Sequence, residues 1–225
     1  MSFEHPFQTD PSEGYYIFRA TWKLIKPEYL TALFVTLINL VAGVGVQLIP
    51  WVGSLAWAFV GVFLNAGIIQ LAHKWHQKES ADFQVLFFAF ESKDVARRLV
   101  PLCIVNLVAA FIADRLGDTM GTFGALLGLL IVVSVMSVVW VATVQTTLEV
   151  VSWRDAFAKA LSAIFLNWKT FFLSTLLMIG GLILSVLTLG LGFLVFFPIV
   201  MFSVYFWYRT MYLGESAKCS DPFSY

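Results

Sequence analysis

Six long runs of mostly apolar, uncharged residues dominate the hydrophobic pattern of this chain. The runs are Tyr29–Ile49, Gly53–Ala72, Leu99–Ala113, Gly121–Leu148, Phe171–Leu187 and Leu191–Tyr208. A helix needs about 20 apolar residues to cross the hydrocarbon core of a bilayer. The third run is shorter, so its helix has to begin inside the basic segment that precedes it. The pattern predicts an all-α integral membrane protein with six transmembrane helices.

Short connections between the runs predict tight turns. The sequence IPWVG at 49–53 combines a helix-breaking proline, an interfacial tryptophan and a flexible glycine. The polar segment DRLGDTMG at 114–121 is expected to be a loop, and Thr188–Gly190 a turn. These three turns pair the six helices into three helical hairpins.

An amphipathic segment precedes each predicted hairpin, at 14–27, 82–90 and 152–169. The last segment places its large apolar side chains near one helical face, which suits a helix lying along the membrane interface. These side chains are Trp153, Phe157, Leu161, Ile164 and Phe165. The chain is therefore expected to form a single membrane domain, 1–225, with three pseudo-repeats at 14–72, 82–148 and 152–212.

Basic residues indicate the orientation of the predicted spans. Of the 14 Lys and Arg residues, all except Arg115 fall in the segments that would share one side of the membrane. Because cytoplasmic loops are rich in Lys and Arg, this distribution predicts that both termini are cytoplasmic. The first twenty residues lack the apolar core of a signal peptide, so no cleaved leader is expected.

Composition and charge then limit the classes of function. Hydrophobic residues make up 60% of the chain, charged residues 12%, and the formal net charge is zero, so no nucleic-acid partner is expected. The central parts of the runs contain no ionisable side chain, which argues against an enzyme, an intramembrane protease or a proton-coupled transporter. The two cysteines, and the pair His73 and His76, lack the spacing or the third ligand of a metal site, so neither a metal nor a cofactor is expected.

Two sets of residues are candidates for a functional role. Three asparagines lie deep in the first three runs, where they line a polar path or join helices by hydrogen bonds: Asn39, Asn65 and Asn106. Five basic residues flank the aromatic block at 83–90, where they contact anionic headgroups or a protein partner, or act only as the topology signal: Lys74, Lys78, Lys93, Arg97 and Arg98. Gly124 and Gly128 form a GxxxG pair that favours close packing of helices.

Several short motifs resemble those of a known group of membrane proteins. They are GYYIFRATWKLIKP at 14–27, IPWVG at 49–53, Asn65-Ala66-Gly67 and DFQVLFFAF at 82–90. The chain resembles the uncharacterised six-span bacterial inner-membrane family of YciC-like and related domains of unknown function. This resemblance implies a bacterial inner-membrane location and brings no established activity. A more local similarity, around Gly14, Trp22–Leu24, Pro27 and Asn39, links the chain to the CysZ sulfate permeases.

Two functions remain open at this point. The first is a non-enzymatic inner-membrane protein that acts by binding membrane lipids or a protein partner, including a second copy of itself, in envelope maintenance or assembly. The second is a channel or facilitator for a small solute, with Asn39, Asn65 and Asn106 along its path.

Overall fold

Helices make up all the regular secondary structure of the described part of the chain. The computed structural model describes residues 6–49, 53–149 and 151–218. Its elements are α1 (Glu13–Ile25), α2 (Tyr29–Gln47), α3 (Gly53–His76), the 3-10 helix η1 (Phe83–Phe87), α4 (Phe88–Glu91), α5 (Lys93–Leu148), α6 (Trp153–Leu166), α7 (Trp168–Leu187) and α8 (Leu191–Tyr212). Within these residues, α2, α3 from Leu55, α5, α7 and α8 are long and apolar enough to cross a membrane. The predicted all-helical architecture with several long apolar helices is confirmed.

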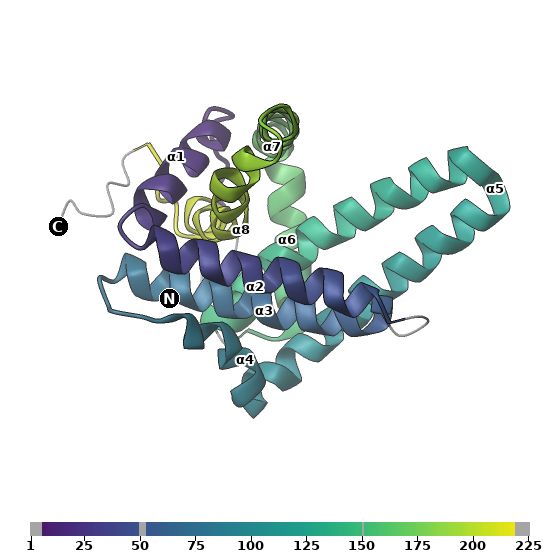
Figure 1. The fold of residues 1–225 in the computed structure, drawn as a ribbon, viewed down its shortest axis with the longest axis horizontal. Helices are drawn as coiled ribbons and strands as arrows, with labels where there is room; N and C mark the ends of the chain where they lie inside the picture. The colour runs from purple at the N-terminus through teal and green to yellow at the C-terminus, as the bar shows by residue number, and fades with distance from the viewer. Residues whose placement is uncertain (1–5, 50–52, 150, 219–225) are drawn as a thin grey trace.

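Helix α5 folds back on itself and projects from the rest of the molecule, as Figure 1 shows. The reversal occurs at Gly121, whose φ of 58° and ψ of −138° are not helical. A residue with a side chain rarely adopts this conformation, so the glycine makes the turn possible. The predicted loop at 114–121 is wrong, because Asp114–Met120 continue the helix and a single residue reverses the chain. The helix also begins at Lys93, which supplies the length that the third run lacks.

The two halves of α5 pack with little space between their backbones. A Cβ atom on Gly124 would lie 1.9 Å from the carbonyl oxygen of Leu116, and one on Gly128 would lie 2.8 Å from that of Ala113. The GxxxG pair therefore packs against the preceding half of its own helix, in agreement with its predicted role in close helix approach.

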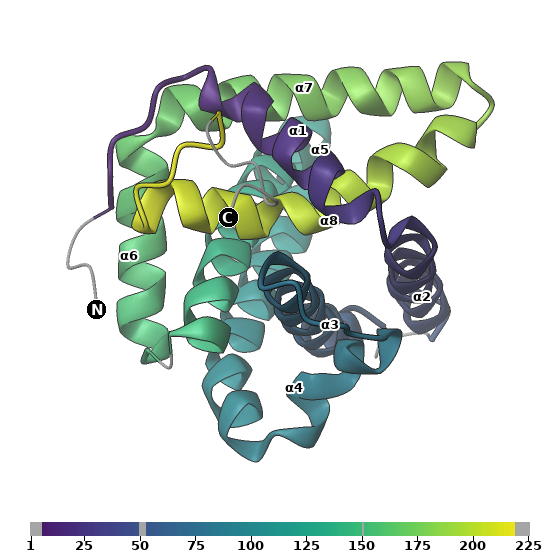
Figure 2. The same cartoon turned by 90° about the vertical axis from the view of Figure 1, so that its left-hand side faces the viewer.

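Two further pairs of long helices run in different directions. Helices α2 and α3 lie side by side and appear lengthwise in Figure 1, where α7 is seen end-on. Figure 2 shows α7 and α8 lengthwise and α2 and α3 end-on, so the α7–α8 pair crosses the direction of the α2–α3 pair. Leu189 and Gly190 have positive φ and make the predicted turn between α7 and α8. The predicted turn at Pro50 lies outside the described residues.

The amphipathic segments form α1, the η1–α4 segment and α6. The second of these is a 3-10 helix with a single α-helical turn, and the carbonyl oxygen of Leu86 packs onto α3 at Gly67. A Cβ atom on Gly67 would lie 2.1 Å from that oxygen, so the contact requires glycine. In α6 the buried residues are Ala156, Ala160 and Ala163, whereas Phe165 is 71% exposed. The small side chains pack most closely against the protein; Trp153, Phe157 and Ile164 of the predicted apolar face are half-buried beside the core, and Leu161 and Phe165 turn outward.

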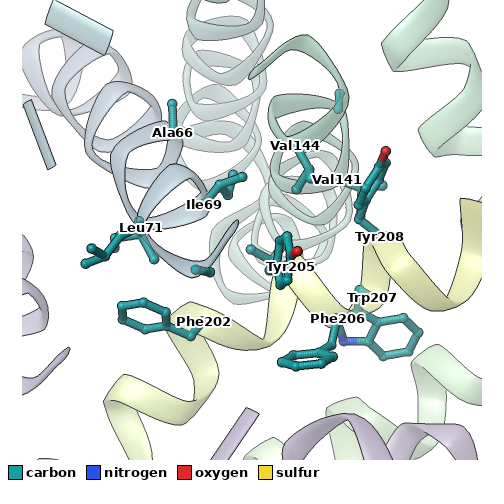
Figure 3. Packing of buried hydrophobic residues seen from close by; sticks show 14 of the residues in the cluster. Ala66, Ile69, Leu71, Val141, Val144, Phe202, Tyr205, Phe206, Trp207 and Tyr208 are labelled. Atoms are coloured by element: carbon teal, nitrogen blue, oxygen red, sulfur yellow. The ribbon is translucent and has the colours of Figure 1, made fainter. Parts of the chain in front are cut away.

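The hydrophobic core lies where α3, the second half of α5 and α8 meet. Figure 3 shows Ile69 and Leu71 of α3, Val141 and Val144 of α5, and the aromatic side chains of α8 gathered in this region. Phe202, Tyr205 and Phe206 are at most 1% exposed. The face of α8 that carries these rings holds the three helical pairs together.

Candidate functional site

Asn39, Asn65 and Asn106 line one small internal cavity, which we call the amide cavity. The asparagines come from α2, α3 and the first half of α5, and the cavity has a volume of about 50 Å³. The other lining residues are Trp57, Gly61, Val62, Met136, Trp140 and Met201. The structure thus brings together the three candidate residues that are far apart in the sequence. A cavity of this size can hold water or a small polar group.

Asn39 is the most enclosed of the three amides. It is 4% exposed, and its Nδ2 atom is buried without a hydrogen-bond partner among the described residues. A buried N–H group that makes no hydrogen bond costs free energy, because it has lost its contact with water. Asn39 therefore has an unused, buried donor in a side chain that lines the amide cavity.

An open groove adjoins the amide cavity on the outside of the molecule. This α2–α8 groove has a volume of about 420 Å³, within the range of sites for small organic ligands. Its walls are Leu40, Gly43, Val44, Gln47 and Leu48 of α2, Trp57 of α3, and Phe197 and Met201 of α8, with Asn39 at its inner end. Asn39, Trp57 and Met201 line both the groove and the amide cavity. The two spaces are therefore separated only by side chains.

The indole of Trp57 forms part of this separation. A Cβ atom on Gly43 would lie 3.0 Å from the ring of Trp57, and one on Gly61 would lie 3.3 Å from it. The indole is thus held between a glycine of α2 and a glycine of its own helix. Larger residues at Gly43 would push the ring from its position.

A third space, the hydroxyl pocket, lies between α5, α7 and α8. It has a volume of about 90 Å³, and its polar lining residues are Ser137, Ser174, Thr175 and Ser203. Trp140 lines both the hydroxyl pocket and the amide cavity. The groove, the amide cavity and the hydroxyl pocket therefore form a series whose neighbouring members share tryptophan walls.

The five candidate basic residues come from two elements and make no ion pair within the described part of the chain. Lys74 lies in the last turn of α3 and Lys78 in the turn that follows it, and Lys93, Arg97 and Arg98 lie in the first turns of α5. Arg98 donates from Nε to the carbonyl oxygen of Asp94 at 3.1 Å, and its Nη1 atom is buried without a partner. The remaining four side chains are available to an anionic group outside the protein.

The aromatic block between these basic residues has an inner and an outer face. Leu86 and Ala89 are fully buried, whereas Phe83, Phe87 and Phe90 are 40–48% exposed. Phe83 contacts Phe34 of α2 with ring centroids 5.4 Å apart, and Phe90 contacts Phe63 of α3 at 4.9 Å. The exposed rings therefore lie on the two helices of the first pair, with Lys93 close behind them in the sequence.

The sequence analysis did not single out a polar network at the end of α8. Arg209 donates to the hydroxyl of Tyr205 at 3.1 Å and pairs with Glu215, and Tyr205 lies 3.3 Å from Nδ1 of His73. Tyr208 donates to Glu149 at 2.6 Å. The signal in the sequence is the spacing of Tyr205, Tyr208 and Arg209, which places them on neighbouring turns of one helix. The contact of Tyr205 with His73 links α8 to α3, and the hydrogen bond of Tyr208 separately links α8 to Glu149 at the end of α5.

The two ends of the described chain also bind each other. The Glu13 carboxylate accepts hydrogen bonds from the hydroxyl of Ser216 at 2.5 Å and from the backbone N–H of Ala217 at 2.8 Å. The backbone N–H of Phe7 donates to the carbonyl oxygen of Met211 at 2.7 Å. The segments before α1 and after α8 therefore lie on the same face of the molecule.

Comparisons with protein-family models, with curated proteins and with solved structures found no significant match to this chain.

Proposed function

We propose that this protein is a non-enzymatic, multi-pass membrane protein that binds a lipid molecule in the α2–α8 groove. The observation that carries the proposal is the opening of an apolar groove of about 420 Å³ beside the buried amide of Asn39. An apolar chain fits the walls of the groove, and a polar group fits its inner end. Neither the groove nor the amide cavity has an ionisable lining residue within the described chain, which favours binding over acid–base catalysis.

The proposal includes six spans in the bacterial inner membrane with both termini in the cytoplasm. The reversal at Gly121 supports counting the two halves of α5 as separate spans, which makes three hairpins. The hydrogen bonds of Glu13 with Ser216 and Ala217 support placing both ends on one side. The positions of Lys and Arg favour the cytoplasm as that side. Membership of the YciC-like group is part of this proposal.

A substitution at Gly43, with one at Gly45 as its matched control, tests lipid binding in the groove. Gly43→Phe should fill the groove and displace Trp57, because a Cβ atom at Gly43 already lies 3.0 Å from the indole. Gly45→Phe adds the same ring two residues away, where no atom lies within 4 Å. We expect ultraviolet labelling of the purified protein by a diazirine-bearing C15 lipid probe to fall at least fivefold for Gly43→Phe only.

The same labelling can also reject the proposal. Equal labelling of both folded variants, or labelled peptides that all lie outside α2, α3 and α8, would show that the groove does not bind the chain of the lipid.

The basic residues near the aromatic block suit a second binding surface on this protein, one that contacts anionic headgroups or a protein partner. Lys93 and Arg97 are exposed and follow the exposed rings of Phe87 and Phe90 closely in the sequence. Because phospholipid headgroups are anionic, such a patch would hold this side of the protein at the membrane surface. Reversing the charges of Arg97 and Arg98 should reduce the amount of anionic lipid that copurifies with the protein. If the amount of copurified lipid, the topology and the capture of a protein partner were all unchanged, this part of the proposal would be rejected.

A second candidate function is a facilitator for a small uncharged solute. The observation that favours it is the series of groove, amide cavity and hydroxyl pocket, with shared walls at Trp57 and Trp140. Sulfate is the substrate of the CysZ permeases. It fits this series poorly because no described residue that lines the groove, the amide cavity or the hydroxyl pocket carries a positive charge. Solute uptake into proteoliposomes should fall when Asn39, Asn65 and Asn106 are all replaced by Leu. Unchanged uptake by that folded variant would exclude the path.

A further inference from the structure

The chemistry of the inner end of the α2–α8 groove restricts the polar group of its ligand. This step rests on the proposed lipid binding and asks which lipid class the groove selects. The inner end is formed by Asn39, with Asn65 and Asn106 behind it in the amide cavity. Each amide offers two N–H donors and a carbonyl acceptor, and none of them is charged.

A charged headgroup is disfavoured at this position. The described residues that line the groove and the amide cavity include no Lys, Arg, His, Asp or Glu. A phosphate, a carboxylate or an ammonium group at this depth would lose its water without gaining an opposite charge, which costs much more than burying a neutral polar group. The amides can replace the hydrogen bonds of a neutral group but cannot balance a charge.

An entirely apolar ligand is disfavoured for the opposite reason. The Nδ2 atom of Asn39 is buried without a hydrogen-bond partner, in a side chain that is 4% exposed. A hydrocarbon would keep this donor unpaired, whereas a hydroxyl or carbonyl oxygen would accept its hydrogen bond. The ligand therefore needs an oxygen acceptor at one end.

The remaining walls suit an apolar chain. From Asn39 the groove follows α2 to Leu48, nine residues further on, which is about 13 Å along a helix. Over this length it is lined by Leu40, Val44 and Phe197, with Gln47 near its outer end. Because the groove is open to the outside, the chain of the ligand can continue into the bilayer.

We propose that the groove binds an uncharged amphiphile, with its hydroxyl or carbonyl oxygen at Asn39 and its apolar chain along α2. Isoprenoid alcohols have this chemistry and are the probes of choice. Phospholipids, whose headgroups are charged, would be excluded from the inner end.

Three C15 competitors with different polar ends test the proposal. Farnesol carries a hydroxyl group, farnesyl phosphate carries a charged group, and farnesane is the hydrocarbon alone. The purified full-length protein in phosphatidylcholine nanodiscs is labelled by a diazirine-bearing farnesol, and each compound competes for the labelling. We expect farnesol to compete at least tenfold better than either of the other two.

Variants connect this preference to Asn39. Asn39→Leu should reduce the preference for farnesol over farnesane to less than twofold, because it removes the unpaired donor. Gln70→Leu, in α3 and outside the lining of both the groove and the amide cavity, should retain the full preference. Equal loss in both variants would contradict the assignment of the oxygen to Asn39.

The competition in the wild-type protein decides the outcome even if Asn39→Leu does not fold. Farnesyl phosphate competing as well as farnesol, or farnesane competing as well as farnesol, would overturn the inference while retaining lipid binding in the groove. The absence of any labelling of α2, α3 and α8 would instead reject the proposed function itself.

Discussion

Single polar residues hold together segments that are far apart in the sequence. The clearest example is Asn167, between α6 and α7, which is 2% exposed. Its Oδ1 atom accepts hydrogen bonds from the backbone N–H and the hydroxyl of Thr9 at 2.7 and 2.9 Å. Its Nδ2 atom donates to the carbonyl oxygens of Phe7 and Ala163 at 3.0 and 3.1 Å. One side chain therefore fixes the N-terminal segment to the start of α7.

Replacing Asn167 should release this segment. Asn167→Leu removes the hydrogen bonds of this side chain to Thr9 and to the carbonyl oxygen of Phe7, so we expect a loss of about 1–3 kcal/mol in stability. Thermal unfolding in detergent and protease cleavage before α1 measure the effect. Ser162→Ala is the control, since the hydroxyl of Ser162 bonds only within its own helix, to Ala158. Equal melting temperatures and cleavage rates for both variants would contradict this role of Asn167.

At the scale of the elements, the reversal of α5 is the feature with the sharpest geometric consequence. A Cβ atom on Gly117 would lie 4.0 Å from the Cβ of Ala125, although eight residues separate them. This distance is within the range of disulfides. In a continuous helix the same residues would be about 12 Å apart.

A designed disulfide tests the reversal directly. With the native Cys103 and Cys219 replaced by serine, the double variant Gly117→Cys and Ala125→Cys should form an intramolecular disulfide under mild oxidation. Mass spectrometry of the peptides, with and without reductant, detects it. Thr119→Cys with Leu130→Cys is a matched pair without such a predicted approach. No disulfide in the first pair would indicate that the chain does not turn back at Gly121.

The elements also show where local pattern and packing differ. The pattern of α6 predicts a helix with a large apolar face, and the helix is present. Its alanines are nevertheless the fully buried residues, because small side chains allow α6 to lie close to α5; Trp153 and Phe157 are half-buried beside the core, and Phe165 faces outward. Hydrophobicity alone does not distinguish a face that meets lipid from one that meets another helix, since both environments are apolar.

At the scale of the whole molecule, the crossing of the helical pairs makes the turn between α7 and α8 the most informative position for topology. Since α7 and α8 run across the direction of α2 and α3, the two pairs cannot both stand along the membrane normal (Figure 2). Both pairs can span the membrane only if they tilt. Leu189 in this turn is 95% exposed, so a cysteine in its place would react with a maleimide on whichever side of the membrane the turn lies.

Single-cysteine labelling tests the six-span topology. In a background without native cysteines, an impermeant maleimide should label Thr119→Cys and Leu189→Cys from outside intact spheroplasts. Lys218→Cys should react only in inverted vesicles, because the proposed topology places both termini in the cytoplasm and the C-terminal segment binds Glu13 near the N-terminus. Labelling of Leu189→Cys from the cytoplasmic side alone would mean that the α7–α8 pair does not cross the membrane.

The sequence by itself determined the helical class, most of the long helices, the turn at Thr188–Gly190 and the set of three asparagines worth following. These features depend on the transfer of a segment from water to an apolar phase and on local backbone preferences, which are properties of the segment alone. Tertiary structure alone decided that Asn39, Asn65 and Asn106 line one cavity, that Trp57 separates it from a groove, and that Gly121 reverses a helix. Those features depend on the register and crossing of helices distant in the sequence, which packing between them selects.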